Sequence, residues 1–131
     1  LGLVSGADGM MRLFPGLVRI PDVAFAAWDR FADGKVPRAP IPDLVPDLAI
    51  EVLSESNTER EMTRKLREYF SAGVRLVWLV DPVARSVAVH ASPNLFLLLN
   101  EDQMLDGGDV LPDFILSLRD LFAELDRQSN P

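Results

Sequence analysis

The sequence has no cysteine and only one histidine, His90, among its 131 residues. Without cysteine the chain cannot form disulfides, a thiolate metal site or a cysteine nucleophile. No segment reaches the roughly 18 consecutive apolar residues of a transmembrane helix. The first residues show neither the basic start nor the apolar block of a secretory signal. We therefore expect a cytoplasmic protein, and because the first residue is Leu1, we expect a natural N-terminal part to be missing.

Basic residues are also scarce, with 13 Lys and Arg against 20 Asp and Glu, which gives a formal net charge of −7. This balance argues against a protein that coats nucleic acid non-specifically, because such proteins usually present a basic face. It leaves open a small site that contacts nucleic acid. The length and the 48% hydrophobic content predict one packed domain spanning residues 1–131.

Hydrophobic periodicity predicts an α/β fold. Overlapping capping-box patterns begin at Ser56 and Thr58, and Gly73 stands where a helix should stop. A helix between two apolar strands favours a crossover, so we expect a mixed β-sheet with helices packed against it. The expected strands cover residues 18–27, 47–54, 74–80, 85–91 and 95–100, and the expected helices run from 56 or 58 to about 72 and over 118–125.

Several catalytic motifs are missing. There is no glycine-rich phosphate loop and no Gly-x-Ser-x-Gly elbow. His90 has no second histidine or cysteine with which to bind zinc, and we interpret it as a surface or sheet-edge residue. The remaining candidates for chemistry are carboxylates.

Glu51 is the most unusual carboxylate, because it interrupts the apolar run from Leu48 to Leu53. A buried, unpaired carboxylate would cost several kcal/mol or become protonated. Lys65 falls on the flank of the apolar stripe of the expected helix, from which it could reach the sheet. Asp22 and Glu51 could hold a hard divalent cation that polarises a phosphodiester, and Lys65 could orient the attacking water or stabilise the developing charge. The alternative is a structural Glu51–Lys65 ion pair with Asp22 in a turn, and spacing leaves both readings open.

Four segments in order are similar to a known family. They are Arg19–Phe25 (R-x-P-D-V-x-F), Pro46–Ser54 (P-D-L-x-I-E-V-L-S), Lys65–Val74 (K-x3-Y-x3-G-V) and Val77–Pro82 (V-W-L-V-D-P). Together they resemble the Uma-two family of bacterial restriction-endonuclease-like proteins in the PD-(D/E)XK nuclease superfamily. The resemblance covers roughly residues 16–122, and it implies a restriction-endonuclease-like mixed β-sheet core flanked by helices. The family's extra N-terminal helical part is absent or nearly so.

The resemblance also implies roles for individual residues. Asp22 and Glu51 match the acidic residues of the first and second motifs, and Asp47 matches a further acid that supports the metal, which would be Mg²⁺ or Mn²⁺. The superfamily's lysine would fall at Leu53, which cannot serve, so the family's lysine from the following helix corresponds to Lys65.

The remaining matches receive structural interpretations. We interpret Tyr69 and Asp81 as packing and turn residues, and Trp78 as a core residue.

Two functions follow from this reading. The first is a metal-dependent endonuclease that hydrolyses DNA, with a homo-oligomer implied by the superfamily. The second is a non-catalytic binding or assembly module on the same fold. Arg60, Arg64 and Arg67 share the outward side of the expected helix and could contact phosphates, although interleaved glutamates are typical of a solvated face.

Overall fold

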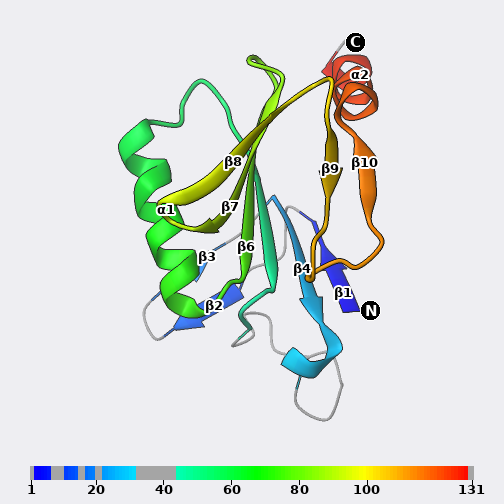
Figure 1. Ribbon diagram of the computed structural model, residues 1–131. Coiled ribbons are helices and arrows are strands. Elements are labelled where there is room, and N and C mark those ends of the chain that lie inside the picture. The colour runs from blue at the N-terminus through cyan, green and yellow to red at the C-terminus, as the bar shows by residue number, and fades with distance from the viewer. Residues whose placement is uncertain (1, 7–10, 15–16, 20–21, 32–43, 130–131) are drawn as a thin grey trace.

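The computed structural model describes residues 2–6, 11–14, 17–19, 22–31 and 44–129, and all structural statements concern these residues. Its centre is a six-stranded mixed sheet with the order β1-β4-β5-β6-β7-β8 (Figure 1). Only β5 and β6 run parallel, and the other neighbours pair antiparallel. The strands are β1 (Gly2–Ser5), β4 (Val23–Ala27), β5 (Leu48–Val52), β6 (Leu76–Asp81), β7 (Ser86–Ser92) and β8 (Leu95–Asn100).

Helix α1 (Glu59–Ala72) makes the crossover between the two parallel strands, as the sequence predicts. The Thr58 side chain caps its N-terminus by accepting a hydrogen bond from the Glu61 amide at 3.1 Å. Gly73 ends it in the left-handed region, with φ of +113°, where a residue with a Cβ would be strained. The helix therefore begins at the capping box of Thr58 and not at that of Ser56.

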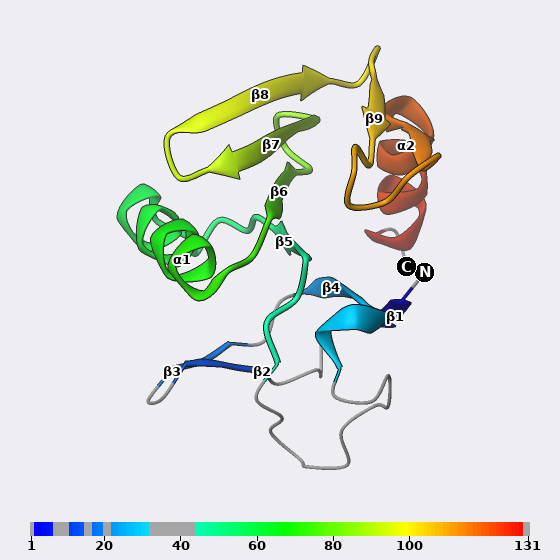
Figure 2. The same ribbon diagram turned by 60° about the horizontal axis from the view of Figure 1, so that its bottom comes forward.

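The C-terminal elements cover the other face of the sheet. Strands β9 (Met104–Asp106) and β10 (Ile115–Ser117) form an antiparallel ribbon that leads into α2 (Leu118–Ser129). Figure 2 shows α1 and α2 on opposite sides of the sheet, with β8 at its edge. A further two-stranded sheet joins β2 (Met11–Phe14) to β3 (Leu17–Arg19), and a short 3-10 helix, η1 (Trp28–Arg30), follows β4.

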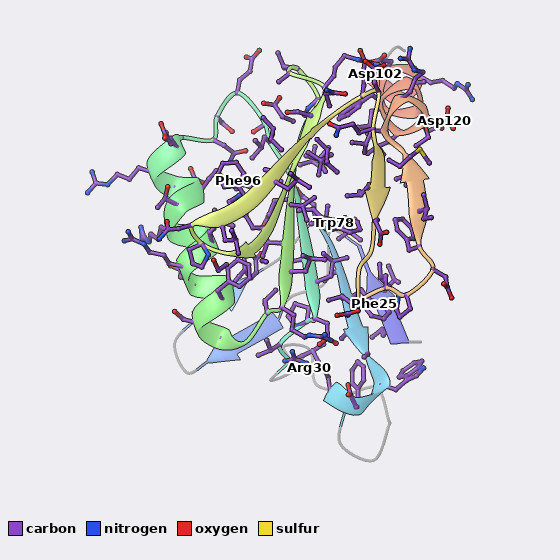
Figure 3. All side chains as sticks on the ribbon, in the orientation of Figure 1. Phe25, Arg30, Trp78, Phe96, Asp102 and Asp120 are labelled. Atoms are coloured by element: carbon purple, nitrogen blue, oxygen red, sulfur yellow. The ribbon has the colours of Figure 1, made fainter. Side chains whose placement is uncertain are left out.

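Each face of the sheet has its own apolar core. Ala49 and Val77 pack with Leu66 and Tyr69 of α1 on one side. On the other side, a second cluster contains Phe25 and Trp78, which point toward β9 and β10, with Leu118 and Phe122 of α2 (Figure 3). Side chains alternate along β4, so that Ala24 and Phe25 belong to opposite cores. Trp78 is a core residue, as predicted.

The structure corrects several expectations. The single strand at 18–27 is wrong, because residues 17–19 pair with β2 in a separate sheet and β4 begins only at Val23. The interpretation of His90 as a surface or edge residue is also wrong. His90 is only 5% exposed, since Phe96 stacks on its ring at a centroid distance of 4.8 Å and β8 takes the edge position. The sequence does not predict β1, β9 or β10, because these strands are too short to show a hydrophobic period.

Candidate active site

The pairing of β4 with β5 brings Asp22 beside Glu51. Val23 lies opposite Ile50, so one further step of the antiparallel register sets Asp22 across from Glu51. Asp22 Oδ2 accepts a hydrogen bond of 2.6 Å from the Val52 amide, which fixes the carboxylate against the end of β5. Both acids line a cavity of about 210 Å³. The sheet register therefore assembles two carboxylates that are 29 positions apart in the sequence.

Helix α1 closes this cavity with Lys65. Its Nζ lies 4.0 Å from Glu51 Oε1, so the lysine does reach back to the sheet from the flank of the apolar stripe. The Lys65 side chain is 22% exposed, which leaves its charge partly shielded from water. The other lining residues are Val52, Ser54, Asn57 and Met62. The structure thus brings Asp22, Glu51 and Lys65 together in one cavity.

Tyr69 is the site residue that sequence reasoning missed. Its hydroxyl donates a hydrogen bond of 2.7 Å to Glu51 Oε1, and the tyrosine itself is buried. The interpretation of Tyr69 as a packing residue is correct for its ring but incomplete for its hydroxyl. The available signal was its position four residues after Lys65, which places both side chains on one side of α1. Asp81 is the last residue of β6, and its side chain holds the turn that follows, in line with the prediction, by accepting hydrogen bonds from the Val83 and Ala84 amides.

The burial of Glu51 and the charges near it are typical of a carboxylate that binds a cation. Burial is the main cause that raises the pKa of Glu51 above its ordinary value, and the nearby charge of Asp22 raises it further. The hydrogen bond from Tyr69 and the charge of Lys65 lower the Glu51 pKa but do not cancel the effect of burial. Among the described residues that line the cavity, one lysine therefore faces two carboxylates, and these groups carry an excess of negative charge when both acids are ionised.

The donor set of this cavity fits a hard divalent cation. Carboxylate oxygens are the ligands that Mg²⁺ prefers, and Mg²⁺ commonly uses one or two carboxylates and keeps several water ligands. Among the described residues, no group of three or more Asp, Glu or His side chains could hold a metal. A cation here would rely on Asp22 and Glu51, with water in the remaining positions.

Asp47 lies apart from this cavity. It precedes β5 by one residue, about 13 Å from Glu51 at roughly 3.3 Å per residue. Its carboxylate is buried and accepts hydrogen bonds from Arg30 Nε at 2.9 Å and from the Ala27 amide at 2.7 Å. Arg75 Nη1 lies 3.9 Å away. The structure therefore places Asp47 in a network that ties η1 to β5, and does not bring it to Asp22 and Glu51.

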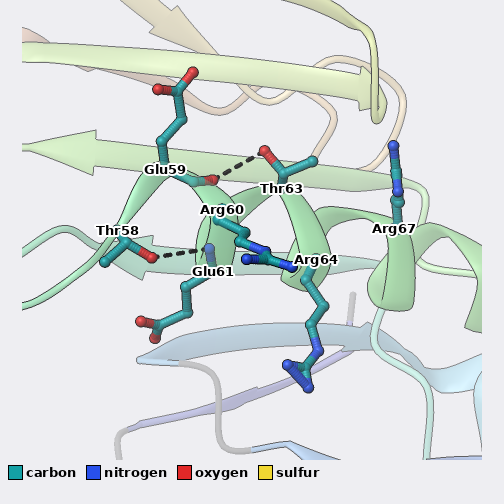
Figure 4. A pocket seen from close by; sticks show the side chains of 7 residues that line it. All are labelled: Thr58, Glu59, Arg60, Glu61, Thr63, Arg64 and Arg67. Carbon is teal, nitrogen blue, oxygen red and sulfur yellow. Dashed lines mark hydrogen bonds between the residues drawn. The ribbon is translucent and has the colours of Figure 1, made fainter.

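The outward face of α1 carries the three arginines that the sequence singled out. Arg60, Arg64 and Arg67 are exposed and border a shallow hollow with Glu59 and Glu61 (Figure 4). Arg64 pairs with Glu68 at 3.4 Å. The mixture of charges agrees with a solvated face, and the spacing of the arginines also suits phosphate contacts.

Comparison with known proteins identifies the family. A family model described as "Uma2: Putative restriction endonuclease" matches residues 1–119. The chain belongs to the Uma2 family. A solved structure from Anabaena variabilis, described as a "putative nuclease belonging to DUF820", superimposes with a TM-score of 0.77 at 23% sequence identity. The alignment covers 93% of this chain and 68% of that one. No curated protein matches the chain.

These similarities confirm the family and the restriction-endonuclease-like α/β fold. Family and fold together indicate a nuclease and imply a nucleic-acid substrate. None of the helices in the described part of this Uma2 chain is long and apolar enough to cross a membrane.

Proposed function

We propose that this Uma2 protein is a Mg²⁺- or Mn²⁺-dependent endonuclease that hydrolyses DNA phosphodiester bonds. The observation that carries the proposal is the convergence of Asp22, Glu51 and Lys65 on one cavity of about 210 Å³. Asp22 directly precedes β4, Glu51 lies on β5, and Lys65 lies on α1. The family match adds support, because it points to the same chemistry without using this geometry.

Each residue has a distinct task in the proposed site. Asp22 and Glu51 would hold the cation, which, when bound, polarises a phosphoryl oxygen and offsets the charge of the transition state. Lys65 brings a positive charge to within 4.0 Å of Glu51 Oε1, where it could orient a water molecule or stabilise developing negative charge. The Tyr69 hydroxyl and the Val52 amide each hold one carboxylate in place.

The charge of the whole chain limits how it would contact DNA. The formal charge of −7 counts Asp22 and Glu51, which a bound cation would partly neutralise. The remaining excess still disfavours tight non-specific binding, so we expect weak contact that depends on metal and is sensitive to salt. Assembly into an oligomer would strengthen such contact by presenting two sites together.

Plasmid nicking with Mg²⁺ or Mn²⁺ tests the proposal. Glu51→Gln and Lys65→Met should each lower the cleavage rate by at least about 100-fold, because they remove a ligand and a cation from the reacting region. Glu55→Gln is a matched control, since this exposed carboxylate lies outside the Asp22–Glu51 cavity. Arg119→Met is the control for loss of a positive charge, because Arg119 lies on α2 and pairs with Asp102.

Calorimetry with Mn²⁺ separates catalysis from binding. We expect wild-type protein to bind the cation and Asp22→Asn to lose most of that affinity. Cation binding without cleavage of DNA or RNA would favour the non-catalytic binding module. Cleavage that persists at the wild-type rate in Glu51→Gln would show that the assigned site is wrong.

A further inference from the structure

Strand β8 lies at the edge of the central sheet yet has the composition of an interior strand (Figure 2). Its first five residues are all apolar, and it contains neither a charge nor a proline. Interior strands read as continuous apolar runs because both of their faces are covered. Four of these five residues are instead largely exposed: Leu95 at 65%, Phe96 at 55%, Leu97 at 63% and Leu98 at 60%.

The register shows that both faces of β8 are open. Leu97 lies opposite Val89 on the α2 side of the sheet, while Phe96 and Leu98 lie on the α1 side, opposite His90 and Ala88. Figure 3 shows Phe96 on this strand. Neither helix layer therefore extends far enough to cover the edge.

The backbone of β8 is open as well. One side of the strand pairs with β7, and no other described strand pairs with its outer side. Proteins usually protect such an edge with a charge, a proline or a very short strand. The opposite edge of this sheet follows that pattern, because β1 has only four residues. β8 has six residues and none of these devices.

We propose that β8 pairs antiparallel with the β8 strand of a second copy of this chain, about a two-fold axis. The occupant of this edge must supply an extended, uncharged strand with open backbone groups and apolar side chains on both faces. β8 itself meets each requirement, and a two-fold axis satisfies both copies at once. The pairing would join two six-stranded sheets into one continuous sheet and cover Phe96, Leu97 and Leu98.

The charges around β8 favour this arrangement. Glu101 and Asp102 follow the strand, while the neutral pair Pro93–Asn94 precedes it. Antiparallel pairing sets the acidic end of one copy against the neutral end of the other, whereas parallel pairing would oppose the acids directly. Within the chain, Arg85 already pairs with Glu101 at 2.7 Å, and Arg119 pairs with Asp102. The contact region is thus nearly neutral, although each copy carries a charge of −7.

Sedimentation velocity over a range of concentrations tests the assembly. We expect wild-type protein to form a species of twice the 14.5 kDa chain mass. Leu97→Lys and Leu98→Lys should each raise the dimer dissociation constant about 100-fold or more, because each would place a lysine from each copy at or beside the two-fold contact. Both positions are exposed, so the variants should fold, which circular dichroism will verify.

Val4→Lys on β1 and Val83→Lys in the turn before β7 are matched controls. Both residues are exposed and apolar, at 66% and 85%, but lie away from β8. A wild-type chain that stays monomeric at all concentrations would overturn the proposal. A dimer that dissociates in the Val4→Lys variant but persists in the Leu97→Lys variant would also overturn it. A third outcome is a monomer in which the outward-facing amides of β8 are nevertheless protected from hydrogen exchange. It would show that another segment of the same chain covers the β8 edge, and it would equally refute pairing with a second copy.

Cross-linking gives a direct geometric test. Because the chain has no cysteine, a single introduced thiol can form a disulfide only between copies. Leu97 and Leu98 lie near the centre of β8. At least one of the variants Leu97→Cys and Leu98→Cys should therefore form a covalent dimer under mild oxidation. Val83→Cys should not. The absence of a cross-link from both β8 positions would exclude antiparallel pairing centred on this strand.

Discussion

The hydrogen bond from Tyr69 to Glu51 allows a quantitative test of the site without a substrate. Tyr69→Phe removes the hydroxyl that donates to Glu51 Oε1 at 2.7 Å and keeps the packed ring. A hydrogen bond to an ionised group contributes about 1.5–3 kcal/mol to stability, against about 0.5–1.5 kcal/mol for a neutral one. The cost of Tyr69→Phe should therefore depend on whether Glu51 is ionised.

The sign of this dependence follows from the pKa of Glu51. Burial raises that pKa, so the folded protein favours the protonated acid, and ionisation costs stability as the pH rises through the raised value. The Tyr69 hydrogen bond opposes this cost because it lowers the pKa. Tyr69→Phe should cost about 2 kcal/mol near pH 9 and about 1 kcal/mol near pH 4. At roughly 3–5 °C per kcal/mol, the higher figure corresponds to a fall in Tm of about 6–10 °C.

Urea denaturation in the presence of a chelator, followed by circular dichroism, measures both values. The control is Tyr69→Phe in a Glu51→Gln background, where the cost should stay near about 1 kcal/mol at every pH. Glu51→Gln alone should stabilise the metal-free protein at alkaline pH, since it removes a buried charge. If Tyr69→Phe costs the same at both pH values, or costs the same near pH 9 with and without Glu51→Gln, the electrostatic account of Glu51 is wrong.

Three further predictions concern the surrounding structure. Asp47→Asn should destabilise the protein by about 2–4 kcal/mol in chemical denaturation, because it weakens the buried contact with Arg30. The same variant should leave the Mn²⁺ affinity nearly unchanged. A large loss of affinity would instead show that Asp47 takes part in the metal site. Burial lowers the pKa of His90 in the folded protein, so stability should fall as the pH drops from about 6.5 toward that lowered pKa. In Tm measurements, His90→Gln should reduce this loss of stability. A dependence of Tm on pH that is the same in His90→Gln as in the wild type would contradict this. If the outer face of α1 contacts phosphates, Arg60→Gln with Arg67→Gln should weaken DNA binding and lower its salt slope by roughly 1–2; an unchanged slope would identify a solvated face.

The local elements of this protein could be predicted because their signals lie within a few neighbouring residues. Thr58 and Glu61 specify the start of α1, and Gly73 specifies its end, through interactions that span less than a turn. The apolar runs at 48–52 and 76–80 indicate buried strands because both faces of β5 and β6 meet core side chains. The carboxylate of Glu51 could be singled out because it interrupts one of these runs.

The structure was needed wherever two distant segments meet. His90 reads as an edge residue, but β8 lies outside β7 and Phe96 covers the ring. Asp47 and Glu51 are four residues apart, a spacing that predicts a shared strand face, yet η1 supplies Arg30 to Asp47 and α1 supplies Lys65 to Glu51.

The sequence by itself therefore determined the helix, the buried strands and the acids available for chemistry. Tertiary structure decided which acids meet, what partners neutralise them and which apolar strand stays exposed. Sheet order and register set these outcomes, and they depend on contacts between segments that no local pattern encodes.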